Sequence, residues 1–306
     1  MDAIRDPSNN DYLEASQKLY NWIIRPLDGD LKSAKVKTLI FVMDGPLRAI
    51  PIGALNDGKQ FLVQKYATAT VPSMGLANLK IPDRRNSKIL VMGLTKANQG
   101  FAALPNIEVE TRLITSKILT ESADLFLDEK FTIENLKKQQ SNKNYGILHI
   151  ASHAQFLSDV ADGAFIQFWN EKLKLSDLRT IRLRAEPIEM LTLSACQTAV
   201  GQNLGLSGTA LIYQAKSILA SLWDVSDAGT TPLMLAFYNY YPKAKSKAIA
   251  IQQAQLDLLE GIVIIEGRKI KGISNLPSIP LNQASDNINL KHPYFWASFI
   301  LVGNWL

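Results

Sequence analysis

The sequence predicts an α/β fold in which a mostly parallel sheet carries helices on both faces. Short apolar runs alternate with amphipathic helical patterns along most of the chain, as in repeated strand–helix units. Runs such as 190–193 are apolar at nearly every position, which is typical of parallel strands buried on both faces. The length of 306 residues suits one large domain or two tightly joined lobes, and a composition of 47% hydrophobic and 20% charged residues is ordinary for a globular protein.

The amino-terminal part is predicted to form a first lobe over residues 1–86. Its predicted elements are an amphipathic helix over 11–27, a strand over 38–43 ended by a turn at Asp44-Gly45-Pro46, and a second strand or hairpin arm over 61–70. Asn9 or Asn10 is expected to cap the helix. The polar, proline-containing stretch 80–87 is the best internal boundary, so a second lobe is expected over 87–306.

The second lobe repeats strands and helices in alternation. Strands are predicted over 88–94, 147–151, 190–193, 217–223 and 297–302, with the last strand closing the sheet; helices are predicted over 106–119, 132–140, 206–215, 229–240 and 244–260. Turn residues at 162–163 and 170–171 interrupt the region 157–175. The long polar stretch 261–291 contains Pro277 and Pro280, and we expect a short hairpin plus a mobile loop there.

Two of the predicted strands end in residues that carry chemistry. The run 190–193 is followed by Ser194, Ala195 and Cys196, the only cysteine of the chain, and the run 147–151 is followed by Ser152 and His153. Sites in open parallel sheets form beyond the carboxyl ends of the strands. If the two strands are neighbours, His153 and Cys196 therefore face each other there. An imidazole draws a nearby thiol towards thiolate and later protonates a leaving amine, which is the minimum needed for covalent acyl transfer.

Each residue also has a structural interpretation. A free cysteine after an apolar strand is more often part of the core than a nucleophile, and a lone histidine is usually structural. His149 illustrates this, since it lies inside the predicted strand and is interpreted as a packed core histidine. What favours a functional role for His153 and Cys196 is their joint placement, each at a strand end among small residues.

Several motifs resemble one known family. HIASHAQF at 149–156 and LSACQTAVG at 193–201 are similar to the His and Cys motifs of CHAT domains, the separase-related, caspase-like peptidase domains of the clan CD type. The resemblance continues in SLWDVSD (221–227), LMLAFYNYY (233–241) and HPYFWASFILVGNW (292–305), and upstream in LIFVMDGPLRAIPIGAL (39–55) and ATVPSMGLANL (69–79). It therefore covers nearly the whole chain in the expected order.

The resemblance implies a caspase-like fold with an amino-terminal pseudo-caspase-like lobe, and a cysteine endopeptidase activity. Cys196 is then the nucleophile and His153 the general base and acid. The backbone N–H groups of Cys196 and Ala154 are expected to hold the oxyanion. Caspase-like enzymes usually carry glycine after the histidine, so Ala154 departs from the pattern and would be strained if a positive φ were required. No third catalytic residue is evident in the sequence.

The motif 217–227 resembles the strand and loop that line the S1 pocket of caspase-like enzymes. Asp227, with Asp224 as second choice, lies just past the predicted strand, and a carboxylate in a cleft favours Arg or Lys at P1. The alternative is that one of the two aspartates caps the helix that is predicted to start near Gly229.

Other chemistries are less well supported. Gly201, Gly205 and Gly208 follow a strand, but their spacing fits no phosphate-binding motif, and three histidines with one cysteine are too few and too dispersed for a zinc site. We expect no cofactor and no metal. The rival interpretations are a non-catalytic interaction or scaffold module on the same fold and an α/β nucleotide-binding regulator.

The expected partners are proteins. CHAT domains are commonly attached to helical repeats that regulate them, so we expect a protein substrate, a regulatory helical-repeat (TPR-like) domain or protein, and weak activity of the chain alone. Basic residues are scattered, no apolar run approaches the length of a membrane span, and the start does not resemble a signal peptide, so neither nucleic acid nor membrane is an expected partner. One cysteine suits a reducing compartment, and we expect a cytoplasmic protein.

Overall fold

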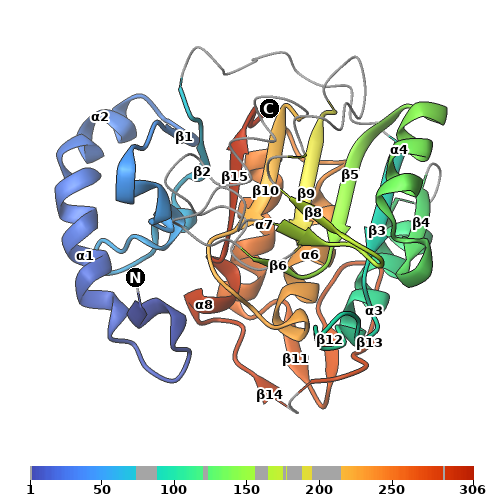
Figure 1. Ribbon diagram of the computed structural model, residues 1–306. Coiled ribbons are helices and arrows are strands. Elements are labelled where there is room, and N and C mark those ends of the chain that lie inside the picture. Colours follow the sequence, from blue (N-terminus) through green and yellow to red (C-terminus); the bar gives the residue numbers. More distant parts are fainter. Residues whose placement is uncertain are drawn as a thin grey trace.

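The computed structural model describes residues 2–73, 88–119, 123–155, 165–174, 177, 188–194, 215–284 and 287–306. Within them, the main sheet has eight strands in the order β1 (Thr38–Phe41), β2 (Ala67–Thr70), β15 (Phe299–Gly303), β10 (Ser217–Ser221), β9 (Met190–Ser194), β5 (Tyr145–Ala151), β3 (Lys88–Gly93) and β4 (Ala123–Leu127) (Figure 1). The predicted 80–87 linker, the predicted helix 206–215 except its last residue, and Cys196 lie outside the described residues.

The sheet consists of two parallel blocks. β1, β2 and β15 run in one direction, and β10, β9, β5, β3 and β4 run in the other. The blocks meet at the antiparallel pair β10–β15, where Ser217 lies opposite Gly303. The mostly parallel α/β architecture is therefore confirmed. The prediction that the last strand closes the sheet at its edge is wrong, because β15 lies inside the sheet.

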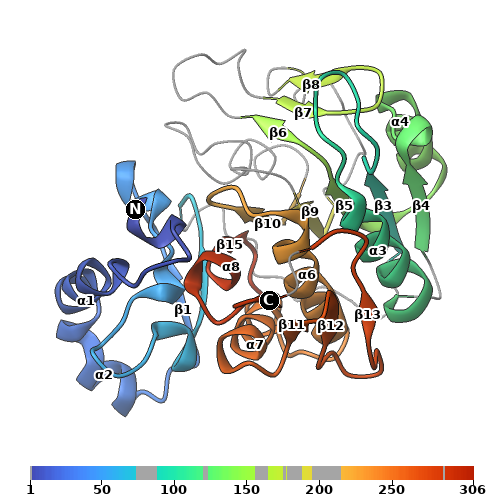
Figure 2. The ribbon, with the colours of Figure 1, turned by 90° about the horizontal axis from the view of Figure 1, so that it is seen from below.

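Burial of the strands on both faces explains their apolar sequences. Every residue of β9 and β10 is buried, and β5 exposes only part of Gly146. Helices α3 (Pro105–Leu113), α6 (Asp227–Tyr240) and α7 (Lys247–Glu260) cover one face, while α4 (Ile133–Asn142) and a small sheet of β6 (Ala154–Gln155), β7 (Phe165–Gln167) and β8 (Lys172–Lys174) lie towards the other (Figure 2). The expectation of helices on both faces is confirmed.

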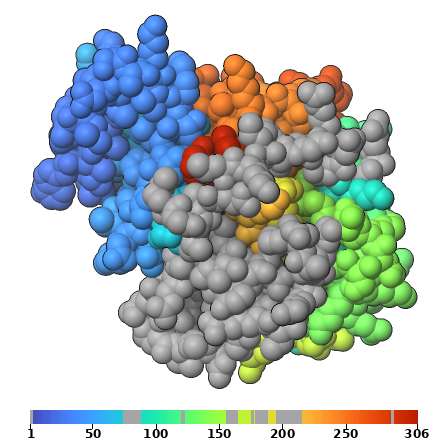
Figure 3. Space-filling model, turned by 90° about the horizontal axis from the view of Figure 1, so that it is seen from above, coloured from blue at the N-terminus to red at the C-terminus, as the bar shows by residue number. Residues whose placement is uncertain are grey.

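The amino-terminal residues lie beside β1 (Figures 1 and 2), on the side of the molecule opposite residues near 125–150 (Figure 3). The predicted helix 11–27 is shorter than expected: α1 (Tyr12–Ile23) ends before a 3-10 turn, Arg25–Leu27, that contains Pro26, and α2 (Asp28–Ser33) follows. Its N-cap is Asp11 rather than Asn9 or Asn10. The alternative of a hairpin arm over 61–70 is also wrong, because β2 runs parallel to β1.

The stretch 261–291 differs most from its prediction. Its described residues contain the predicted hairpin, formed by β11 (Ile264–Glu266) and β12 (Lys269–Lys271). Where a loop was expected, β13 (Ile279–Pro280) and β14 (Asn287–Ile288) extend this hairpin into a four-stranded antiparallel sheet. Gly267 and Arg268 both have positive φ (55° and 59°), as the tight turn between β11 and β12 requires. The short helix α8 (Pro293–Trp296) then leads into β15.

The structure also bears on membrane association. In the parts of the chain that the structure describes, no helix combines the length and apolar character needed to cross a bilayer.

Candidate active site

The two strands that were predicted to deliver the reactive residues are neighbours. β5 and β9 run parallel, with Ala151 opposite Ser194, and the Ser152 N–H donates to the Ser194 carbonyl at 3.2 Å. β10 follows on the other side of β9, so three carboxyl ends meet at one edge of the sheet. His153 lies two residues past the end of β5. Cys196 follows β9 by two residues in the sequence and lies outside the described residues.

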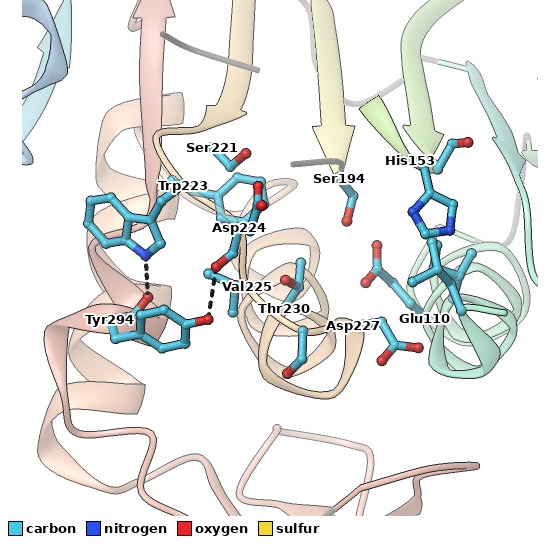
Figure 4. Close-up of a pocket in the computed structure, with 15 residues that line it drawn as sticks. Glu110, His153, Ser194, Ser221, Trp223, Asp224, Val225, Asp227, Thr230 and Tyr294 are labelled. Atoms are coloured by element: carbon cyan, nitrogen blue, oxygen red, sulfur yellow. Dashed lines mark hydrogen bonds between the residues drawn. The ribbon is translucent and has the colours of Figure 1, made fainter. Parts of the chain in front are cut away.

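A cavity of about 280 Å³ opens at this edge (Figure 4). Its lining combines strand-end residues with the loop after β10 and with one face each of α3 and α6. The lining residues are Leu104, Ile107, Glu110, Ser152, His153, Ser194, Ser221, Trp223, Asp224, Val225, Ser226, Asp227, Thr230, Tyr294 and Phe299. Three of the predicted site residues, His153, Asp224 and Asp227, are thus brought to one cavity.

The His153 imidazole is held by a backbone group. Its Nε2 atom lies 2.8 Å from the Ala102 carbonyl oxygen, and its ring stacks on Phe101 with centroids 4.9 Å apart. Because a carbonyl oxygen only accepts, Nε2 carries the hydrogen, and Nδ1 of the neutral ring keeps its lone pair. The ring is therefore fixed with Nδ1 available as a base. Sequence reasoning missed Ala102, since a backbone carbonyl has no residue-specific signal.

Ala154 follows His153 in the edge strand β6. The Gln167 N–H donates to the His153 carbonyl, and Ala154 is opposite Ile166, so Ala154 occupies a non-hydrogen-bonded position of the β6–β7 ladder. Its N–H consequently points away from β7 and is not used by that ladder. The φ angle of Ala154 is not positive, and its side chain therefore causes no backbone strain at this position.

Asp227 lies at the junction of two helix N-termini. Its carboxylate accepts from the Asn106 backbone N–H (2.8 Å), from Asn106 Nδ2 (3.2 Å) and from the Ala228 N–H (2.8 Å). Asn106 lies in the first turn of α3 and Asp227 in the first turn of α6. Ser226 is the N-cap of α6, since its side chain accepts from the Gly229 N–H. Asp227 therefore connects the two helices while it lines the cavity.

Asp224 is more exposed and is positioned through its backbone. The Tyr294 hydroxyl donates to the Asp224 carbonyl at 2.8 Å, and Trp223 Nε1 donates to the Tyr294 carbonyl at 3.0 Å (Figure 4). These two bonds fix the loop after β10 against α8. The exposed Asp224 side chain lies at the rim of the cavity.

The cavity is electronegative. Three carboxylates, from Glu110, Asp224 and Asp227, line it together with one imidazole. Glu110 was not predicted as a site residue. It is 1% exposed, and its Oε1 atom lies 3.0 Å from Nε2 of the buried His149, a contact that is not aligned as a hydrogen bond. Among the described residues, no group of three or more His, Cys, Asp or Glu side chains could hold a metal ion.

Comparison with known proteins gives a consistent result. The CHAT domain family model matches residues 13–304. No curated protein matches the sequence significantly. Among solved structures, separase of Saccharomyces cerevisiae in complex with securin superimposes with a TM-score of 0.55 at 15% identity, over 87% of this chain and 15% of the separase chain. The chain thus spans about 15% of the length of that separase chain.

Gingipain structures are also similar in fold. The complex of the pro- and mature domains of Porphyromonas gingivalis RgpB has a TM-score of 0.52 at 8% identity, over 99% of this chain and 69% of that one. The Arg-specific cysteine proteinase gingipain R has a TM-score of 0.50 at 8% identity, over 99% of this chain and 67% of that one. At these identities the likeness concerns the fold.

Proposed function

Because the chain belongs to the CHAT domain family, we propose that it is a cysteine endopeptidase that acts through a dyad of Cys196 and His153. The observation that carries this proposal is the position of the His153 imidazole. His153 follows β5, the direct neighbour of the strand that leads to Cys196, and the Ala102 carbonyl fixes its ring. A thiol with a positioned imidazole is sufficient for nucleophilic acyl transfer.

The reaction proceeds in two steps. His153 Nδ1 takes the proton of the Cys196 thiol, the thiolate attacks the scissile carbonyl carbon, and a C–S bond forms. The tetrahedral intermediate then collapses, the C–N bond breaks, and the imidazolium gives its proton to the leaving amine. In the second step His153 takes a proton from water, and hydroxide attacks the thioester carbon to form a second tetrahedral intermediate. The C–S bond then breaks to release the acid, and the imidazolium returns its proton to the thiolate, which restores the thiol.

The oxyanion of each intermediate requires donors. The Ala154 N–H is a suitable donor because the β6–β7 ladder does not use it, and the Cys196 N–H is the proposed second donor. The Ala154 N–H belongs to an edge strand whose ladder to β7 holds the backbone, so this donor stabilises the oxyanion without reorganisation.

We propose a basic P1 residue, with Asp224 as the main specificity residue. The sequence favoured Asp227, but three hydrogen bonds already occupy the Asp227 carboxylate, whereas the Asp224 side chain is exposed at the rim. The three carboxylates of the cavity lining support a cationic substrate side chain. The described Arg specificity of gingipain R is in line with this proposal.

Regulation by a protein partner is part of the proposal. The separase neighbour was solved with securin, and the present chain spans a small part of such a protein. We propose that a helical-repeat (TPR-like) domain or protein activates this chain and that the isolated chain is only weakly active. We also propose a cytoplasmic location, since a single cysteine suits a reducing compartment.

The proposal is tested by cleavage of a positional peptide library. The wild-type chain is expected to cleave after Arg or Lys, Cys196→Ala to be inactive, and His153→Ala to lose several orders of magnitude in kcat/KM, because the dyad acts as a unit. Asp224→Ala is expected to weaken the basic preference, with Asp30→Ala, an exposed aspartate on α2, as the charge-matched control. Full activity of either dyad variant would refute the peptidase mechanism.

A further inference from the structure

A chain of four buried polar side chains runs from the cavity into the core. Glu110 on α3 is 3.0 Å from His149 on β5; His149 Nδ1 is 3.1 Å from the Tyr238 hydroxyl on α6; and Tyr238 donates to Thr192 Oγ1 on β9 at 2.8 Å. Glu110 is 1% exposed, and the other three are 0% exposed. Interactions between polar groups this deeply buried are strong, so the loss of one contact has a large effect on the neighbouring groups.

The direction of the hydrogen bonds follows from the chemistry. Burial raises the pKa of Tyr238 well above its ordinary value, although the Thr192 hydrogen bond opposes this, so the hydroxyl remains protonated. Since Tyr238 donates to Thr192, it accepts from the N–H at His149 Nδ1. The other ring nitrogen, Nε2, then faces the Glu110 carboxylate. Tyr238 therefore hydrogen-bonds both His149 and Thr192, while Glu110 contacts the second ring nitrogen of His149 without an aligned hydrogen bond.

The network includes one residue from each of β5 and β9, the two strands that precede the proposed dyad residues. His149 and Thr192 are directly opposite in the β5–β9 ladder, and each precedes a dyad residue, His153 or Cys196, by four positions in the sequence. Tyr238 contacts both of them from α6. The network thus joins β5, β9 and α6 immediately before the site.

The Glu110 contact reaches the site by a second route. From α3, Glu110 contacts His149 of β5, and Ala102, the carbonyl that orients His153, lies just before the start of α3 at Pro105. A shift of α3 relative to β5 would therefore change the distance between Ala102 and the imidazole. Small displacements of this kind have large effects on reacting groups.

We propose that Glu110, His149, Tyr238 and Thr192 are positioning residues that set the alignment of His153 with Cys196. This inference rests on the proposed dyad. It differs from a purely structural role, because it requires that removing one hydroxyl from the network changes the chemistry of the thiol and not only the stability of the fold.

The test is the rate at which iodoacetamide alkylates Cys196 as a function of pH, read by intact-protein mass. Cys196 is the only cysteine, so alkylation reports on it alone, and no substrate or activator is required. In the wild-type protein the imidazole should keep the alkylation rate high at pH values well below the ordinary thiol pKa of about 8.5. In His153→Ala the rate should instead fall as the pH drops below about 8.5, as for an ordinary thiol. We expect Tyr238→Phe, Thr192→Val and Glu110→Gln to lower the rate near pH 6 at least fivefold, towards that of His153→Ala.

Matched variants separate positioning from general destabilisation. Thr192→Ser keeps the hydroxyl of the network. Tyr240→Phe removes a hydroxyl that is also on α6 but bonds to Asp257, outside the network. Glu108→Gln neutralises an exposed carboxylate on α3. These three should follow the wild-type profile. If Tyr238→Phe does not fold, the positioning role is tested by comparing the alkylation rates of Thr192→Val, which lacks the hydroxyl, and Thr192→Ser, which keeps it.

The outcomes distinguish the inference from the proposed function. Network variants that superimpose on the wild type while His153→Ala is shifted would overturn the positioning role and leave the dyad intact. A His153→Ala profile identical to the wild type would overturn the dyad, and the positioning role with it.

Discussion

At the scale of single residues, the orientation of His153 depends on a group without a side chain. The Ala102 carbonyl accepts from Nε2, so the hydrogen of the neutral imidazole lies on Nε2 and the lone pair on Nδ1 before any substrate binds. The position of His153 at a strand end was predictable from the apolar run that precedes it. The carbonyl partner was not, because 51 residues separate Ala102 from His153 and only the placement of α3 brings them together.

A second residue-scale feature is the ion pair Asp57–Lys65, with Asp57 Oδ2 2.5 Å from Lys65 Nζ. Burial alone would raise the pKa of Asp57, but hydrogen bonds from Lys65 and from the Gln60 and Lys59 N–H groups outweigh it and lower the pKa to about 2. Between this value and the ordinary 3.8, the unfolded chain binds more protons, so stability rises with pH.

We therefore predict that Asp57→Asn lowers the free energy of unfolding by about 2 kcal/mol at neutral pH and has little effect near pH 2. The pair's contribution is complete above pH 3.8 and is lost as the pH falls through about 2. Urea unfolding of both proteins across this range measures it. An equal difference at both ends of the range would exclude the ion pair as the cause.

At the scale of elements, Asp227 joins the N-termini of α3 and α6, whereas Asp224, three residues earlier, is the proposed specificity residue. Asp227 satisfies N–H groups at the N-termini of both helices, where a negative charge also interacts favourably with the helix dipoles. Asn106 extends the junction, since its Oδ1 atom accepts from the backbone N–H groups of Asn282 and Gln283.

The two aspartates should therefore respond differently to substitution. Asp227→Ala is predicted to lower the free energy of unfolding by roughly 1–3 kcal/mol, because it leaves buried donors unpaired. Asp224→Ala should change it by less than about 0.5 kcal/mol and raise KM for substrates with basic P1. Chemical denaturation and steady-state kinetics on the two variants measure these effects. A stable Asp227→Ala protein with a raised KM, together with a destabilised Asp224→Ala protein, would assign the specificity role to Asp227.

Elements were predictable where burial is deep and the run is long. β3, β5, β9 and β10, together with α6 and α7, lie where their apolar patterns indicated, since both faces of each element are largely enclosed. In the sheet of β11 to β14 only the β11–β12 hairpin was predicted, because β13 and β14 have two residues each and show no periodicity.

At the scale of the whole molecule, the site lies on one of the two parallel blocks. The carboxyl ends of β5, β9 and β10 meet at the cavity, while β1, β2 and β15 run in the opposite direction and end at the other edge. The sequence predicted the parallel strands but not this reversal, because the neighbour of a strand is chosen by the packing of segments far apart in the chain. Glu110 and Tyr294 escaped prediction for the same reason, since they reach the cavity from α3 and α8.

The central claim is that Cys196 is a nucleophile activated by His153. It is tested most directly by reacting the protein with a peptidyl acyloxymethyl ketone that carries Arg at P1 and mapping the adduct by mass spectrometry. We expect a single adduct on Cys196, no adduct in Cys196→Ala, and a rate at least a hundredfold lower in His153→Ala. An unmodified Cys196, an adduct at another residue, or an equal rate in His153→Ala would contradict it.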